Sequence, residues 1–247
     1  MVELALFTTS SGDAGLDTAI SAELARQVGR GSLGPVARLH RTRPILAFGR
    51  ADRTSPGYPE AVATARAFGY EPVERLAGGR AAVFHAGTLA FSLALPVAEP
   101  RLGITDRFDL VAGLTRDALV SLGADARIGA VPGEYCPGSH SVNAAGRTKV
   151  AGFGQRLYPG SAHVGGVVVV EGADRIRDVL VPVYRALDLD WDPATAGAVS
   201  DEVGVDLDGV TRALSEALGH VFDVVAAPIP DGVVEAARSR ADTLRPT

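Results

Sequence analysis

Cysteine and lysine are almost absent from this chain of 247 residues. It has one cysteine, Cys136, and one lysine, Lys149, and its other 23 basic residues are all arginine. The single cysteine excludes an internal disulfide. A buried ammonium can lose its proton, whereas a guanidinium cannot. We therefore expect Lys149 to occupy a site where arginine is not equivalent.

Long apolar runs and an excess of basic charge are missing as well. The apolar stretch 163–170 is far shorter than the roughly 18 residues of a membrane span. The formal net charge of −5 argues against broad nucleic-acid binding but leaves room for a local basic patch. The first residues, MVELALFTTSS, lack the basic segment of a signal peptide. We expect a soluble, cytoplasmic protein that binds neither nucleic acid nor membranes.

The remaining composition is that of a globular protein, with 47% hydrophobic and 21% charged residues. The length suits one domain over residues 1–247 with a substantial core. Apolar periodicity and turn residues predict the following elements. Helices are expected at 14–28, 59–68, 108–122, 175–187, 207–218 and 233–240, and strands at 35–40, 45–48, 71–75, 81–84, 88–95, 139–143, 147–155 and 162–170.

Two strand pairs are joined by short turns and are expected to form hairpins, 81–84 with 88–95 and 139–143 with 147–155. The polar residues at the end of the chain are expected to fray. Paired strands with helices before and after them indicate an α+β fold, with a mixed or antiparallel sheet flanked by helices.

Cys136 lies in the turn Tyr135-Cys136-Pro137-Gly138, thirteen residues before Lys149. A turn exposes a thiol to a substrate, and a nearby cation favours the reactive thiolate form. The alternative is a buried structural cysteine. The spacing of the two residues suggests a nucleophile with its activating partner.

Lys149 begins the apolar, glycine-spaced segment 149–154 (KVAGFG). Glycine within a strand often marks the close approach of a ligand or another backbone. Apolar neighbours would lower the pKa of the lysine and allow proton exchange near neutrality. The alternative is a solubilising charge on an edge strand.

The glycine pair Gly78-Gly79 lies between two expected strands, in the segment 75–85 (RLAGGRAAVFH). Such a pair can direct backbone amides at a carbonyl or a phosphate, or it can be a simple turn. His85 is either a catalytic base or a core histidine. The chain lacks GxxxxGK[ST], GxSxG and HExxH motifs and any cluster with metal-ligand spacing, so we expect no metal site.

These segments resemble, in order along the chain, the lipoate/biotin protein ligase and octanoyltransferase superfamily. The resemblance runs from about residue 16 to residue 218. It rests on the segments Arg43–Arg50 (RPILAFGR), Arg75–Arg80 (RLAGGR), His85–Ser92 (HAGTLAFS) and Lys149–Gln155 (KVAGFGQ). Tyr135–Ser139 (YCPGS) is more selective, because it resembles the branch of octanoyl-protein amidotransferases that work through a cysteine.

The resemblance implies a catalytic domain of the lipoate–biotin ligase type that transfers an acyl group. Cys136 would attack an octanoyl or lipoyl carbonyl, and Lys149 would hold the thiolate and take a proton from the incoming lysine amine. The expected substrate-binding residues are Arg75, Gly78, Gly79, Arg80, His85, Gly152, Phe153 and Gln155, with Val83, Phe91 and Val150 as further liners of an acyl tunnel.

The partners implied by the resemblance are proteins. The donor would be acyl carrier protein or the glycine-cleavage H protein, and the acceptors would be lipoyl domains of 2-oxoacid dehydrogenase complexes. The acyl group is a substrate, and no cofactor is expected. Backbone amides near Gly78-Gly79 or Gly152 are candidates for stabilising the oxyanion.

Some positions depart from the family pattern. Glu74 stands where many members carry arginine, Arg80 replaces a third glycine, and one residue separates His85 from Gly87. The first two changes favour a transferase over an ATP-dependent lipoate ligase, which would need nucleotide and magnesium but no cysteine. We also expect no room for the C-terminal accessory domain of the larger ligases. A third class is a non-catalytic lipoyl-binding protein, which would need neither Cys136 nor Lys149.

Overall fold

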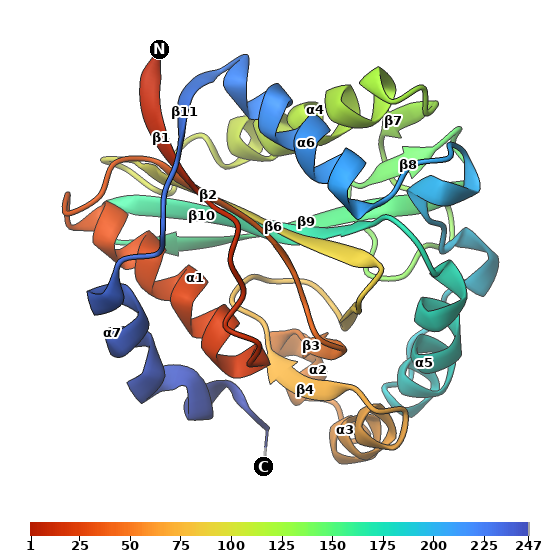
Figure 1. Cartoon of the computed structure of the whole chain (residues 1–247). Coiled ribbons are helices and arrows are strands. Elements are labelled where there is room, and N and C mark those ends of the chain that lie inside the picture. The colour runs from red at the N-terminus through yellow and green to blue at the C-terminus, as the bar shows by residue number, and fades with distance from the viewer. Residues whose placement is uncertain (247) are drawn as a thin grey trace.

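The computed structural model of the chain describes residues 1–246 and has an α+β fold built on two sheets (Figure 1). The large sheet has the strand order β11-β1-β2-β6-β10-β9-β8-β7, and the small sheet has the order β4-β3-β5. In the large sheet the strands β11, β1 and β2 are parallel, and each later pair is antiparallel. The expected α+β class with a mixed sheet is confirmed.

The strands of the large sheet are β1 (Val2–Phe7), β2 (Val36–Arg41), β6 (Thr88–Pro96), β7 (Ala126–Ile128), β8 (Val142–Ala144), β9 (Thr148–Tyr158), β10 (Ser161–Val169) and β11 (Phe222–Ala226). Those of the small sheet are β3 (Ile45–Phe48), β4 (Glu71–Glu74) and β5 (Ala82–Phe84). The helices are α1 (Ala14–Gly29), α2 (Arg50–Arg53), α3 (Tyr58–Ala67), α4 (Ile104–Ser121), α5 (Ala173–Ala186), α6 (Leu207–Gly219) and α7 (Asp231–Ala241), with single 3-10 turns at Pro193–Thr195, Val199–Asp201 and Asp242–Leu244.

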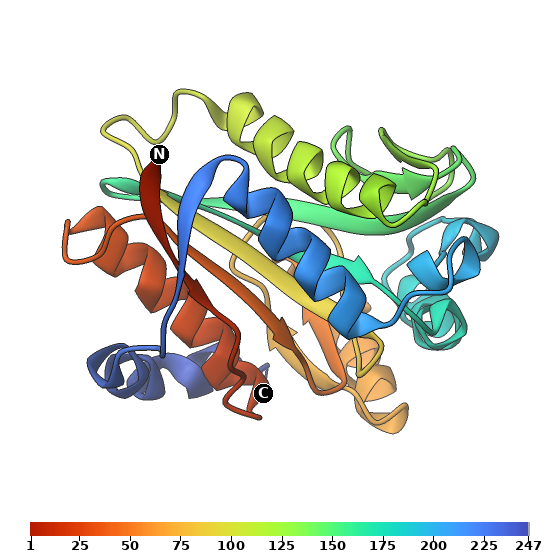
Figure 2. The ribbon, with the colours of Figure 1, turned by 45° about the horizontal axis from the view of Figure 1, so that its top comes forward.

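The helices cover both faces of the large sheet. Helices α4 and α6 lie side by side on one face, and α1 and α7 lie on the other (Figure 2). The small sheet lies on the same side as α1, and α3 and α5 pack against it in a separate apolar cluster (Figure 1). The space between the two sheets is therefore bounded by α1 and by the loops that join the sheets.

The expected helices all form, with boundaries close to those expected. Asp13 caps α1, because its side chain accepts a hydrogen bond from the Leu16 amide. Helix α5 continues through Pro182. Strands β1, β7 and β11 and the short helix α2 were not predicted from the sequence. None of the helices within residues 1–246 has both the length and the apolar character needed to cross a membrane.

The expected hairpin between 81–84 and 88–95 is wrong, because β5 and β6 belong to different sheets. A tight turn separates them: the Thr88 amide donates to the His85 carbonyl (2.9 Å), and the Gly87 amide donates to His85 Nδ1 (3.0 Å). The Gly87 carbonyl accepts hydrogen bonds from Val170 and Glu171 at the end of β10. This corner turns the chain from the small sheet into the large one. The second expected hairpin, β8 with β9, is confirmed.

The expected fraying of the last residues is also wrong for the described part of the chain. Arg245 forms ion pairs with Asp13 (2.6 Å), Glu71 (2.9 Å) and Asp242 (2.6 Å). The Pro246 carbonyl accepts a hydrogen bond from the Arg66 guanidinium (2.8 Å). These contacts attach the end of the chain to α1, α3 and β4, while Thr247 lies outside the described residues.

A buried ion pair between Asp17 and Arg38 joins α1 to β2. The two side chains are 7% and 0% exposed, and the guanidinium also donates to the Asp17 carbonyl (2.8 Å) and the Thr9 carbonyl (2.9 Å). Burial alone would raise the pKa of Asp17. The Arg38 charge and hydrogen bonds from Ser10 and Ser11 outweigh burial and hold that pKa below its usual value. The pair therefore fixes α1 against the sheet.

We predict that Arg38→Met lowers the free energy of unfolding by about 3–5 kcal/mol, because it leaves the Asp17 carboxylate buried without its counter-ion. The double variant Arg38→Met/Asp17→Leu should recover most of the loss, since it removes both charges. The measurement is denaturant unfolding at pH 7. A loss below 1 kcal/mol in the single variant would show that the pair does not hold α1 in place.

Because the pKa of Asp17 is lowered by folding, its stabilising contribution is present above its unfolded value of about 3.9 and is lost as the pH falls below that value. The single variant should therefore lose less stability at pH 3 than at pH 7.

Candidate active site

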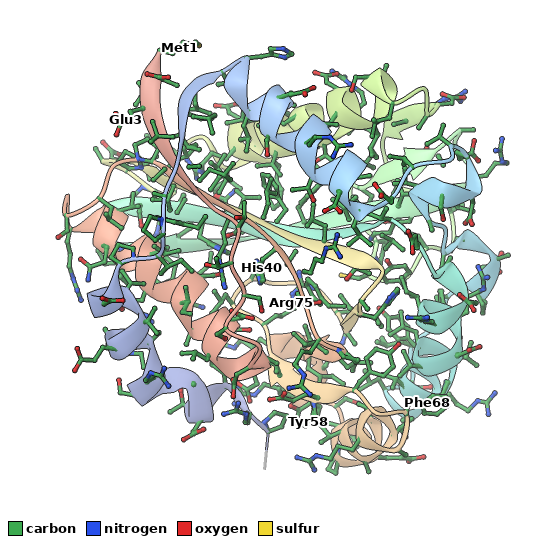
Figure 3. All side chains as sticks on the ribbon, viewed as in Figure 1. Met1, Glu3, His40, Tyr58, Phe68 and Arg75 are labelled. Atoms are coloured by element: carbon green, nitrogen blue, oxygen red, sulfur yellow. The ribbon has the colours of Figure 1, made fainter. Side chains whose placement is uncertain are left out.

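A cavity of about 550 Å³ lies between the large and small sheets. Its floor is the face of the large sheet formed by β6, β9 and β10, and its walls come from the small sheet and from α1. The loop 131–141, called the cysteine loop below, borders it at the β9 side. Arg75 and His40 both line this cavity, and Figure 3 places them at the centre of the molecule. The volume is typical of small-molecule sites.

The floor is formed mainly by small residues. Paired positions across the strands place glycine, alanine or serine side by side, as in the row formed by Ser92, Gly165 and Gly154. Phe84 of the small sheet and Phe153 of β9 add apolar surface. A long, narrow apolar chain would fit above such a floor.

Cys136 sits in the cysteine loop with its backbone in the left-handed region (φ +44°), directly before Pro137. Such a conformation is uncommon for a residue other than glycine and persists only where the surroundings impose it. The thiol is half-buried, and its Sγ accepts hydrogen bonds from the Arg80 amide (3.1 Å) and the Arg75 Nη1 (3.7 Å). Both donors stabilise negative charge on the sulfur.

The turn Gly78-Gly79 brings these two donors to the sulfur. Gly79 has φ +106°, and a Cβ at that position would lie 2.9 Å from Cys136 Sγ and 2.9 Å from Arg75 Nη1. Glycine is therefore required there for the sulfur to approach. The next residue, Arg80, directs its amide at Sγ, while its side chain turns away to Asp52 (3.3 Å).

Glu134 organises the cysteine loop from inside the protein. Its carboxylate accepts hydrogen bonds from the Val131 amide (2.9 Å), the Gly138 amide (3.1 Å) and the Ser141 hydroxyl (2.6 Å). Its fourth partner is Lys149 Nζ (3.1 Å). A buried carboxylate with four donors closes the loop into one conformation, because each donor comes from a different part of the loop or from β9.

Lys149 is 3% exposed and lies beneath the cysteine loop. Its three ammonium hydrogens are matched by three acceptors: Glu134 Oε1, the Tyr135 carbonyl (3.0 Å) and the Cys136 carbonyl (2.8 Å). Burial lowers the pKa of Lys149, although the charge of Glu134 opposes that effect. The direction agrees with the sequence analysis, and the burial excludes the alternative of a solubilising edge charge.

The arrangement corrects one expectation about Lys149. The donors directed at the Cys136 sulfur are Arg80 and Arg75, whereas the ammonium bonds to the backbone carbonyl of Cys136. Gly152 makes this possible, because a Cβ there would lie 2.8 Å from Lys149 Cε. The Lys-x-x-Gly spacing thus allows the lysine arm to pass over its own strand toward the loop.

Most of the other expected substrate-binding residues line the cavity. These are Arg75, Gly78, Gly79, Gly152, Phe153 and Gln155, together with Phe91. Gln155 is also tied to α4, since its side chain accepts from Arg107 Nε (2.9 Å) and donates to the Ile104 carbonyl (3.2 Å). Arg80 reaches the site only through its amide. Val83 and Val150 lie in the apolar cores instead of the cavity lining.

The expectation for His85 needs correction, because its ring lies outside the cavity lining. It is 2% exposed, and its Nδ1 accepts the Gly87 amide (3.0 Å). Burial lowers its pKa to about 4. The Gly87 amide bonded to Nδ1 and the Thr88 amide bonded to the His85 carbonyl hold the histidine in the corner between the two sheets.

Two carboxylates of the site, Glu134 and Asp52, were not predicted from the sequence. Asp52 is fully buried, accepts the Gly49 amide (2.8 Å) and pairs with Arg80, so it supports the turn that carries the Arg80 amide. Glu134 directly precedes Tyr135-Cys136, so a carboxylate next to the expected thiol was visible in the sequence. Its side chain points into the protein because of the loop geometry, and no local sequence pattern predicts that orientation.

The chain is similar to several known proteins. A family model for the lipoyl protein ligase A/B catalytic domain matches residues 13–186. An octanoyl-[GcvH]:protein N-octanoyltransferase of Geobacillus kaustophilus is 32% identical over 175 residues, which are 71% of this chain and 62% of that relative. A lipoyl-[GcvH]:protein N-lipoyltransferase of Listeria monocytogenes is 26% identical over 187 residues, 71% of this chain and 67% of the relative. The matched part thus spans less than two thirds of the first relative's length.

Solved structures share the fold. A lipoate-protein ligase A bound with ATP superposes with a TM-score of 0.77 at 20% identity, covering 98% of this chain and 95% of that one. A bipartite lipoate protein ligase from Thermoplasma acidophilum gives a TM-score of 0.76 at 20% identity, covering 98% and 92%. At this identity the likeness concerns the fold alone.

We predict that Glu134→Gln loosens the cysteine loop and lowers the pKa of Lys149 further, because the amide keeps the shape but removes the opposing charge. Stability should fall by about 3 kcal/mol or more at pH 7. Ser141→Ala, which removes one hydrogen bond to the same carboxylate, should cost only about 1 kcal/mol. Denaturant unfolding measures both variants, and equal losses in the two would contradict a central role for the charge.

Proposed function

Because this chain belongs to the lipoyl protein ligase A/B catalytic domain family, we propose that it is an acyltransferase that works through a thioester. It takes an octanoyl or lipoyl group from a donor protein onto Cys136 and passes it to a lysine of an acceptor protein. One observation carries the proposal: the Cys136 sulfur lies at a largely apolar cavity with the Arg80 amide and the Arg75 guanidinium directed at it.

In the first half-reaction Cys136 Sγ attacks the acyl carbonyl of the donor. The Sγ–C bond forms, the bond to the donor's amine or thiol breaks, and the thiol proton ends on that leaving group. The Arg80 amide lies within hydrogen-bond distance of the sulfur and is therefore close to where the carbonyl oxygen becomes an oxyanion. Arg75 adds positive charge at the same place.

In the second half-reaction the acceptor's lysine amine attacks the thioester. The new C–N bond forms, the C–Sγ bond breaks, and one amine proton returns to the sulfur. Lys149 is placed to assist, since its ammonium already contacts the Cys136 carbonyl and burial favours loss of its proton. Glu134 is a positioning residue, because it holds both Lys149 and the loop.

The proposed partners follow from the relatives' names. Both relatives are named for acyl groups on GcvH, so the glycine-cleavage H protein is the donor that the comparisons favour over acyl carrier protein. Lipoyl domains of 2-oxoacid dehydrogenase complexes would be the acceptors. The proposed location of the protein is the cytoplasm, because it would meet such complexes there.

The proposal includes no nucleotide or metal cofactor. The positive side chains near the glycine turn are matched by carboxylates, Arg53 by Glu74 (2.6 Å) and Arg80 by Asp52 (3.3 Å). Two carboxylates beside a triphosphate would be unfavourable. An ATP-dependent ligase is the second candidate, since the solved structures with this fold include a ligase bound with ATP.

The first test is to incubate the protein with octanoyl-GcvH without ATP and to weigh the intact chain. We expect the mass of one octanoyl group to be added to the parent and not to Cys136→Ser, because a hydroxyl is a much weaker nucleophile than a thiolate here. As a control, free octanoate with ATP and magnesium should give little product. Full transfer by Cys136→Ser would rule out the thioester, and efficient ATP-driven ligation would favour the second candidate.

The second test separates proton exchange from charge at Lys149. Lys149→Arg keeps the positive charge but must fit a guanidinium into the three-acceptor pocket, so both half-reactions should slow. Transfer to the acceptor should fall by about 10²–10⁴-fold more than acylation of Cys136, because guanidinium cannot accept a proton. Single-turnover rates of each half-reaction in Lys149→Arg and Lys149→Ala measure the difference. If arginine restored both steps to the parent rate, Lys149 would act only as an electrostatic anchor.

A further inference from the structure

We propose that the start of α4 and the loop before it, residues 99–108, form a docking ledge for the protein that brings its lysine to Cys136. Leu102 and Ile104 are the apolar contacts of this ledge. The inference rests on the proposed acyl transfer and deepens it, because it assigns the surface on which the protein substrate is held. Leu102 lies outside the cavity lining, so its contribution can be separated from the chemistry.

The docking ledge borders the cavity where the large sheet is open. Strand β8 pairs with β9 only between residues 148 and 151, and within the described chain no other strand covers the same edge of β9 at 152–158. The start of α4 lies beside this open stretch, because the Gln155 side chain donates to the Ile104 carbonyl (3.2 Å). Ile104 lines the same cavity as Cys136. The docking ledge is therefore part of the cavity's rim.

Two large apolar side chains of the docking ledge face solvent. Leu102 is 63% exposed and Ile104 is 40% exposed. The polar residues beside them, Arg101 and Asp106, are exposed as well. An apolar centre with a polar border is typical of protein interfaces, and exposed apolar side chains grouped at a site often mark a binding surface.

The exposure of these side chains is built into the loop. Arg107 is 7% exposed, and its guanidinium donates to the Leu102 carbonyl (2.7 Å) and the Pro100 carbonyl (2.7 Å) as well as to Gln155 (2.9 Å). The Leu102 amide donates in turn to the Glu99 carbonyl (2.9 Å). These bonds fix the backbone that presents Leu102 to solvent. A surface ordered in this way loses little conformational entropy when a partner binds.

The docking ledge is also connected to the cysteine loop. The His140 ring of that loop stacks on Phe108 of α4, with 5.1 Å between the ring centroids. Its Nε2 lies 3.2 Å from Asp109 Oδ1, also on α4. A protein held on the docking ledge is therefore held at a defined position relative to Cys136.

The occupant that fits is a folded protein with a lysine beside an apolar patch. A lysine side chain reaches on the order of 6 Å from its Cα to its Nζ, so the backbone that carries it must come about that close to the thioester. The surface around the lysine then covers the rim of the cavity, where an apolar patch would bury Leu102 and Ile104. A second copy of this chain fits less well, because a copy seated on the rim would obstruct the cavity that the acyl donor must reach.

The test compares a protein donor with a small donor in the parent and in Leu102→Ser. With octanoyl-GcvH, we expect the second-order rate constant of Cys136 acylation to fall by about tenfold or more, because the variant loses a leucine that is buried on binding. The rate at saturating octanoyl-GcvH should change little. With the octanoyl thioester of N-acetylcysteamine, which has no protein surface to dock, the rate should stay at the parent value.

The matched control is Val120→Ser, at a 50% exposed position near the other end of α4, which should change neither rate. Both variants should keep the unfolding temperature of the parent, since both side chains are exposed. Equal losses with the two donors would make Leu102 a structural part of the cavity. That result, or unchanged rates with both donors, would overturn the docking ledge while leaving acyl transfer intact.

Binding of acyl-free GcvH, measured by titration calorimetry, gives a readout that does not need transfer. We expect Leu102→Ser to weaken this binding by about tenfold or more. Such a loss of binding, in a protein whose parent transfers no acyl group, would contradict the proposed function but support the docking ledge. A parent dimer in sedimentation that Leu102→Ser dissociates would assign the ledge to a second copy and overturn the proposed occupant.

Discussion

The ion pair between Glu134 and Lys149 is the contact on which the site depends. Both side chains are buried, and neither is stable there without the other, because an unpaired charge in the interior is strongly unfavourable. Each partner also forms hydrogen bonds with the cysteine loop. The carboxylate accepts from the amides of residues 131 and 138 and from the hydroxyl of residue 141, and the ammonium donates to the carbonyls of residues 135 and 136. The pair therefore fixes the backbone that presents the thiol, including its left-handed conformation at Cys136.

Two sources of positive charge have different roles in this arrangement. Lys149 fixes the loop from the β9 side, and the donors that face the sulfur come from the glycine turn that follows β4. Asp52 positions this turn, since its carboxylate pairs with Arg80 and accepts a hydrogen bond from the Gly49 amide. Both carboxylates are buried next to the cations they hold, and of the two cations Lys149 is buried whereas the Arg80 side chain is 38% exposed. Arg75 lines the cavity, and its guanidinium donates to the Arg80 carbonyl and to the Cys136 sulfur.

The sequence predicted the fold well where local patterns determine it. Helices such as α1 and α6 have clear apolar periodicity and side-chain caps, and the β8–β9 turn has its own turn residues. The error at β5 and β6 arose because a short turn between two strands looks the same whether they pair or enter different sheets. That choice depends on Gly87 bonding to the end of β10, which is a long-range contact. In the site, Cys136 and Lys149 were found by their rarity, whereas Glu134 and Asp52 look like any other carboxylate until the loops close around them.

The geometry also explains why a chain so biased toward arginine keeps one lysine. The Lys149 side chain passes so close to Gly152 that a Cβ there would lie 2.8 Å from its Cε. Its Nζ is surrounded by three hydrogen-bond acceptors. An ammonium has three donors on a single atom and suits that arrangement, whereas a guanidinium is a flat fork whose donors spread over three nitrogens. Arginine would need a wider pocket and a different loop. The composition that marked this residue in the sequence is thus the consequence of a three-acceptor pocket, which itself exists because Glu134 turns inward.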